Sequence, residues 1–187
     1  AGPVSVELPI DVQEAEVNFP ADLGASPIEV PIPSPEAIDA LAEALVFARR
    51  PMLWLGGGAR QASAEVRRLI DLGFGAVTSV QGRGIIAEGH PRSLGSFNLQ
   101  PAIEEFYVTC DAMIVVGSRL RGNETLKYTL RLPRPLYGID ADPMAENRSY
   151  LHDRFVAGDA ALALDELANR LDGRMKIDPE LAGDLAQ

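Results

Sequence analysis

The chain has 187 residues, of which 47% are hydrophobic and 24% charged, and its formal net charge is −10. These proportions are ordinary for a globular protein and allow one well-buried domain with tails. The acidic excess argues against a nucleic-acid surface, which needs clustered Lys and Arg, and disfavours docking on an anionic membrane. We therefore expect neither a nucleic-acid partner nor a membrane partner.

Cys110 is the single cysteine, so no internal disulfide can form, which is typical of a reducing compartment and predicts a cytoplasmic location. Because it precedes an apolar run, we expect a small core residue rather than a nucleophile. His90 and His152 are the only histidines and have no neighbouring ligands at metal spacing, so no metal site is predicted. We identify no catalytic acid–base pair either.

The beginning of the chain differs from the rest. Residues 3–8 have the pattern of a strand but no neighbouring strand to pair with, and the first residue is Ala1. Six prolines follow between residues 3 and 33, which predicts an extended linker. These features predict a piece cut from a longer polypeptide.

Secondary structure becomes regular at Ser34, where Ser34-Pro35-Glu36 has the form of a helix N-cap followed by a first-turn proline and acid. The helix is predicted to run to about Arg49. A buried strand then leads through Gly56, Gly57 and Gly58 into an amphipathic helix, which is how a βαβ unit opens.

Apolar runs alternate with helical segments along the remaining chain. Strands are predicted at 75–80, 111–116, 135–139 and 153–157, and helices at 101–107, 125–130 and 160–171. Asp159 is expected to cap the last helix. This alternation predicts an α/β fold, a doubly wound, mostly parallel six-stranded sheet of Rossmann-like type with helices on both faces.

In such sheets a ligand binds outside the carboxyl ends of the strands, at the point where the strand order reverses. The unusual residues follow those strand ends. The predicted cofactor-binding residues are Gly56, Gly57, Gly58, Gln81, Gly82, Arg119 and Asp140.

Each of these assignments has a structural alternative. The glycines could bring backbone amides to a pyrophosphate or only permit close strand–helix packing. Arg119 could clamp a phosphate or lie on the surface. Asp140 could bind ribose hydroxyls or cap a turn, and for Asp142-Pro143 capping is the favoured interpretation.

Five motifs occur in one order, and together they closely resemble the central domain of thiamine-diphosphate-dependent enzymes of the acetolactate synthase and benzoylformate decarboxylase type. They are Pro51 to Gly58, Gln81 to Gly95, Cys110 to Arg119, Ile139 to Pro143 and Val156 to Asp159. The resemblance implies that residues 1–13 end a preceding pyrimidine-binding domain and 14–33 form an interdomain linker. Residues 34–172 are then the central nucleotide-binding-like domain, and 173–187 a linker or tail.

The resemblance also implies an activity for the whole polypeptide, namely decarboxylation or carboligation of 2-keto acids. Thiamine diphosphate and Mg²⁺ would bind to the flanking domains of neighbouring subunits, in a homodimer or homotetramer, and this segment would carry no catalytic residue. In acetolactate synthases the central domain holds FAD. Here Leu120-Arg121-Gly122-Asn123 replaces the aromatic and acidic pair that typically follows the arginine, so FAD, another nucleotide and an empty site all stay open.

Two other functional hypotheses remain at this point. One is a stand-alone FAD- or NAD-binding domain, and the other is a non-catalytic interaction module. The flanking sequence would separate both from the thiamine-diphosphate hypothesis.

Overall fold

A computed structural model describes residues 5–16, 18 and 29–186 of the chain. Its centre is a sheet in which every neighbouring pair of strands is parallel. The strands are β1 (Pro51–Leu55), β2 (Gly75–Thr78), β3 (Ala112–Val116), β4 (Leu136–Asp140) and β5 (Arg154–Ala157), in the order β2-β1-β3-β4-β5. The order reverses between β1 and β3, so this is where a ligand crevice is expected.

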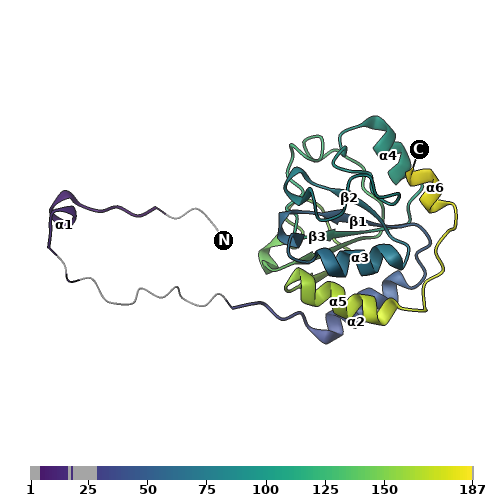
Figure 1. The fold of residues 1–187 in the computed structure, drawn as a ribbon, viewed down its shortest axis with the longest axis horizontal. Coiled ribbons are helices and arrows are strands. Elements are labelled where there is room, and N and C mark those ends of the chain that lie inside the picture. The colour runs from purple at the N-terminus through teal and green to yellow at the C-terminus, as the bar shows by residue number, and fades with distance from the viewer. Residues whose placement is uncertain (1–4, 17, 19–28, 187) are drawn as a thin grey trace.

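Helices cover both faces of the sheet (Figure 1). α2 (Pro35–Leu45), α3 (Ser63–Asp71) and α5 (Ala160–Leu171) pack on one face, and α4 (Pro101–Tyr107) and α6 (Leu181–Leu185) on the other. Alternate residues of each strand face the two layers. In β1, Leu53 faces the first core and Trp54 the second, and both are fully buried. The predicted α/β fold with helices on both faces is confirmed.

The expected caps are also present. The Ser34 hydroxyl accepts the Ala37 N–H at 3.3 Å, and Asp159 accepts the N–H groups of Ala161 and Leu162 at 2.9 and 3.1 Å. Asp142 accepts the Met144 N–H at 2.9 Å and begins the short 3₁₀ helix η3 (Pro143–Ala145). α2 ends at Leu45, four residues before the predicted end.

The sheet has five strands in the described part of the chain, where the sequence predicts six. Residues 5–8 form no strand and are exposed, and residues 3 and 4 of that predicted strand lie outside the described residues. Instead, residues 92–95 cover the outer edge of β2. Their backbone bonds to Ala76 and Thr78 at 2.8 Å occupy groups that an edge strand would leave unpaired. α1 (Ile10–Gln13) is fully exposed.

The predicted helix at residues 125–130 is wrong. Leu126, Lys127 and Tyr128 have φ values of 49°, 55° and 70°, in the left-handed region, so no right-handed helix can pass through them. Thr125 anchors the turn instead, because its carbonyl accepts the N–H groups of Thr129 and Leu130. The apolar spacing of the segment resembles a helix, but of its apolar residues Leu130 is buried whereas Leu126 and Tyr128 are exposed.

The end of the chain packs on the domain. Leu181 and Leu185 of α6 are buried in the second core, and the carboxylates of Asp178 and Asp184 bind the Arg50 guanidinium at 2.9 and 2.7 Å. Residues 173–187, predicted as a linker or tail, therefore include a packed helix. No helix among the described residues has the length and apolar character needed to cross a membrane.

Candidate functional site

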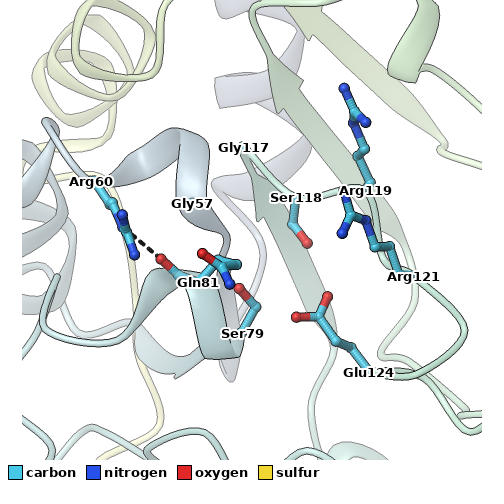
Figure 2. A pocket seen from close by; sticks show the side chains of 9 residues that line it. All are labelled: Gly57, Arg60, Ser79, Gln81, Gly117, Ser118, Arg119, Arg121 and Glu124. Atoms are coloured by element: carbon cyan, nitrogen blue, oxygen red, sulfur yellow. Dashed lines mark hydrogen bonds between the residues drawn. The ribbon is translucent and has the colours of Figure 1, made fainter. Parts of the chain in front are cut away.

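A cleft of about 510 Å³ opens at the carboxyl edge of the sheet, beside the point where the strand order reverses. Three loops form it, and they follow β1, β2 and β3 (Figure 2). Its lining residues are Gly57, Arg60, Ser79, Gln81, Gly117, Ser118, Arg119, Arg121 and Glu124. Gly57, Gly82, Arg119 and Asp140 all follow or end parallel strands at this one edge, as the sequence analysis requires.

Glycines let the three loops touch through their backbones. A Cβ at Gly56 would lie 2.2 Å from the Gly117 carbonyl oxygen, one at Gly58 2.8 Å from the Gly117 Cα, and one at Gly82 2.1 Å from the Leu55 carbonyl oxygen. The Gly58 N–H donates to the Gly117 carbonyl at 3.0 Å. The packing interpretation thus accounts for Gly56, Gly58 and Gly82, and Gly57 is the residue of the triple glycine that lines the cleft.

Arg60 and Gln81 form one wall. The Arg60 Nε donates to the Gln81 carbonyl at 2.7 Å, which fixes the guanidinium plane beside the cleft (Figure 2). Gln81 is placed by η2 (Val80–Gly82), a 3₁₀ turn whose N-cap is Ser79, and the Ser79 hydroxyl accepts the Gly82 N–H at 3.1 Å. Arg60 was not predicted from the sequence, although its place two residues after the triple glycine is a usable signal.

The opposite wall comes from residues 118–124. Leu120 has φ 44° and is 2% exposed, so its side chain enters the second core while the residues on either side reach the cleft. Figure 2 shows the Arg121 guanidinium and the Glu124 carboxylate on the cleft side, opposite Ser79 and Gln81. The cleft lining therefore contains three arginines, Arg60, Arg119 and Arg121, and one carboxylate, in a chain whose formal net charge is −10. In Figure 2 the Arg119 guanidinium points away from the other labelled side chains, whereas that of Arg121 lies beside Ser118. Such a local positive site attracts anions.

Asp140 lies apart from the cleft lining. It ends β4, and its carboxylate accepts the Asp142 N–H at 2.9 Å, which closes a turn. Its backbone carbonyl accepts the Gly158 N–H at 2.8 Å. The contacts of Asp140 are those of the capping alternative. Of the predicted site residues, the structure thus brings Gly57, Gln81 and Arg119 to the cleft.

Two titratable side chains outside the cleft, Cys110 and Tyr107, are buried in the second core. Burial raises the pKa of the Cys110 thiol to about 12, so this residue is neutral at pH 7, and its predicted place in the core is confirmed. Burial also raises the pKa of Tyr107 well above its usual value. Among the residues described, no three His, Cys, Asp or Glu side chains gather as metal ligands.

The family model described as "Thiamine pyrophosphate enzyme, central domain" matches residues 38–167, which contain the whole sheet and all three cleft loops. The chain belongs to this family. The match begins within α2 and ends within α5. It therefore covers the sheet and its loops, but not the residues before α2 and not α6.

Relatives in the family carry several names. Over 173 residues the chain is 32% identical to a protein of Pseudomonas aeruginosa named as a probable 2-ketoarginine decarboxylase, covering 90% of this chain and 31% of that protein. It is 30% identical to glyoxylate carboligase of Escherichia coli O157:H7, covering 100% of this chain and 34% of the enzyme. The chain therefore spans about a third of the length of these curated relatives.

A solved structure supports the same relationship. It is described as a thiamin diphosphate-dependent enzyme from Mycobacterium smegmatis, and the two chains superpose with a TM-score of 0.63 at 25% identity. The matched region is 82% of this chain and 32% of the other. Sequence and fold thus match this chain to the central-domain portion of longer relatives.

Proposed function

We propose that this chain is the central domain of a thiamine-diphosphate- and Mg²⁺-dependent enzyme that decarboxylates or ligates 2-keto acids, in the manner of acetolactate synthase. The family match and the names of the relatives support this, since a 2-ketoarginine decarboxylase and a glyoxylate carboligase both bear names of 2-keto acid chemistry. When bound, thiamine diphosphate supplies the electron sink for decarboxylation. The flanking domains of a homodimer or homotetramer in the cytoplasm would hold it.

We further propose that the cleft binds the diphosphate of a nucleotide, with FAD as the first ligand to test. The observation that carries this is that Arg60 and Arg121, together with Arg119, belong to the lining of a glycine-walled cleft at the switch point of the sheet. Guanidinium groups pair well with phosphate oxygens. The Gly57 backbone can approach such a ligand closely, because glycine itself has no side chain.

The nucleotide proposal is tested by mixing the purified protein with FAD, removing unbound flavin, and recording the visible absorbance. We expect flavin to be retained, and Arg60→Ala with Arg121→Ala to release it. If the unsubstituted protein loses flavin but retains ADP, the ligand of the cleft is another adenine nucleotide rather than FAD. Failure to retain either would refute the proposal for the cleft.

The enzymatic proposal needs the polypeptide that carries this chain together with its flanking domains. We expect consumption of a 2-keto acid such as pyruvate only when thiamine diphosphate and Mg²⁺ are both added. Consumption that is independent of thiamine diphosphate would contradict the proposal. So would turnover by this chain alone.

A further inference from the structure

The wall at residues 118–124 continues past Glu124 to Leu130, and the backbone of this longer wall, residues 119–130, is unusual. Leu120, Leu126, Lys127 and Tyr128 have positive φ values, and within the described residues the single other non-glycine with a positive φ is Asn147. Left-handed conformations are unfavourable for such side chains and persist only where surrounding contacts enforce them. Something must therefore hold this wall in place.

Local bonds to the Thr125 carbonyl hold the turn within this wall, and bonds at the two ends of the wall come from the loop at residues 147–152, which we call the clasp. The Ser149 hydroxyl donates to the Arg119 carbonyl at 2.8 Å, at the start of the wall. The Tyr150 hydroxyl donates to the Leu130 carbonyl at 3.1 Å, at its end. Two adjacent residues thus fix both ends of the segment that brings Arg121 and Glu124 to the cleft.

Two hydrogen bonds join the ends of the clasp, Asn147 and His152. The His152 N–H donates to the Asn147 side-chain oxygen at 2.7 Å, and the Asn147 N–H donates to the His152 Nδ1 at 3.2 Å. The His152 ring packs against Phe155 with ring centroids 5.6 Å apart, and a Cβ at Gly138 would lie 3.0 Å from the His152 Cδ2. The reciprocal bonds and the ring packing give Ser149 and Tyr150 a rigid support on β4 and β5.

We propose that the clasp positions the arginine-bearing wall for ligand binding, and that Ser149 and Tyr150 are positioning residues of the cleft. Neither side chain lines the cleft, so their effect passes through the Arg119 and Leu130 carbonyls. The proposal rests on the proposed function of the cleft. It adds that ligand affinity depends on the loop between β4 and β5, because bonds from this loop hold the two ends of a wall that contains four left-handed residues.

The test measures two quantities on the same protein. ADP is the probe, and its dissociation constant is measured by calorimetry in the unsubstituted protein and in Ser149→Ala, Ser149→Thr, Tyr150→Phe and Leu151→Ala. Amide hydrogen exchange of residues 120–124 is measured without ligand. Leu151→Ala is the matched control, because its side chain is 69% exposed on the same loop.

We expect Ser149→Ala and Tyr150→Phe to weaken ADP binding about tenfold and to speed the exchange of residues 120–124 by a similar factor. Ser149→Thr keeps the hydroxyl and restores both, and Leu151→Ala changes neither. Unchanged affinity in Ser149→Ala, in a protein that binds ADP, would overturn the positioning role. If the unsubstituted protein binds no ADP, the function proposed for the cleft fails, and unchanged exchange in Ser149→Ala would then overturn the clasp as well.

Discussion

The two edges of the sheet use arginine in opposite ways. At the amino edge, Arg50 binds the carboxylates of Asp178 and Asp184, and its side chain is 14% exposed. At the carboxyl edge, Arg60 is oriented by a single carbonyl, and among the described residues neither it nor Arg121 has a carboxylate partner. One edge satisfies its charges within the fold, and the other keeps guanidinium groups oriented toward a cleft. The first arrangement supports stability, and the second is the one on which the proposed nucleotide binding depends.

Hydrogen bonds to the backbone also stabilise the amino edge of the sheet. The Asp111 carboxylate accepts the N–H groups of Arg49 and Arg50 at 2.7 and 2.9 Å, which ties the start of β1 to the start of β3. The Asp178 N–H donates to the Arg49 carbonyl at 2.8 Å. These bonds join three separate parts of the chain, so substitutions here should affect folding before anything else.

The largest effect is expected at the carboxyl edge, where backbones meet. Gly82→Ala places a methyl group 2.1 Å from the Leu55 carbonyl oxygen, and a main-chain atom cannot move aside cheaply. We expect a loss of about 3 kcal/mol or more in the free energy of unfolding, measured in urea. Gly89→Ala is the control, because its Cβ meets nothing within 4 Å. Equal stability of the two variants would contradict the interlocked loops.

The next effect is expected at the amino edge. Arg50→Ala leaves Asp178 and Asp184 without their cation and should lower the free energy of unfolding by about 2 kcal/mol. Hydrogen exchange at residues 178–186 should rise, since α6 loses its anchor. Arg174→Ala, which breaks a more exposed pair with Glu43, should cost about 0.5 kcal/mol or less. Unchanged exchange in Arg50→Ala would show that α6 is held by its leucines alone.

Substitution of a cleft arginine should affect ligand affinity more than the free energy of unfolding. Arg121→Ala is expected to change the free energy of unfolding by no more than about 0.5 kcal/mol and to weaken ADP binding about tenfold, by loss of a charge-assisted bond. Arg67→Ala, which removes an exposed arginine of α3 outside the cleft lining and outside the clasp, provides the charge-matched control. A large loss of stability in Arg121→Ala, with affinity kept, would erase the distinction between the edges.

The smallest effect concerns pH and the clasp. Burial lowers the pKa of His152, opposed by the nearby Glu146 and Asp153 carboxylates and assisted by Arg134. Below about pH 6.5 the unfolded chain binds a proton that the folded imidazole resists, so stability is complete above that pH and falls as the pH decreases through the lowered pKa. His152→Gln should flatten this part of the pH dependence of unfolding. If the pH dependence of unfolding is unaltered in His152→Gln, groups other than His152 cause it.

The sequence predicts the strands, most helices and the edge of the sheet that bears the cleft, because strand periodicity and cap residues are local signals. It places Gly57, Gln81 and Arg119 correctly at one edge, since parallel strands bring their carboxyl ends together. It does not separate packing glycines from the cleft-lining Gly57, because that depends on how closely the loops after β1, β2 and β3 approach.

The errors have physical causes as well. The turn at 125–130 has helical spacing, but the Thr125 carbonyl closes a left-handed turn and the Tyr150 hydroxyl, 20 positions from Leu130, binds its end. The place of Arg60 after the triple glycine is a local signal, but its orientation by the Gln81 carbonyl and the contacts of the clasp are not, because they join residues more than 15 positions apart. Long-range contacts of this kind build most of the site.

The central claim is that the carboxyl-edge cleft binds a nucleotide diphosphate through its arginines. Calorimetric titration with ADP of the unsubstituted protein and of the Arg60→Ala/Arg121→Ala double variant tests it most directly. We predict binding of one ADP with a dissociation constant on the order of micromolar, and a loss of at least about 30-fold in the double variant. Absence of ADP binding, or equal affinity in the two proteins, would contradict the claim.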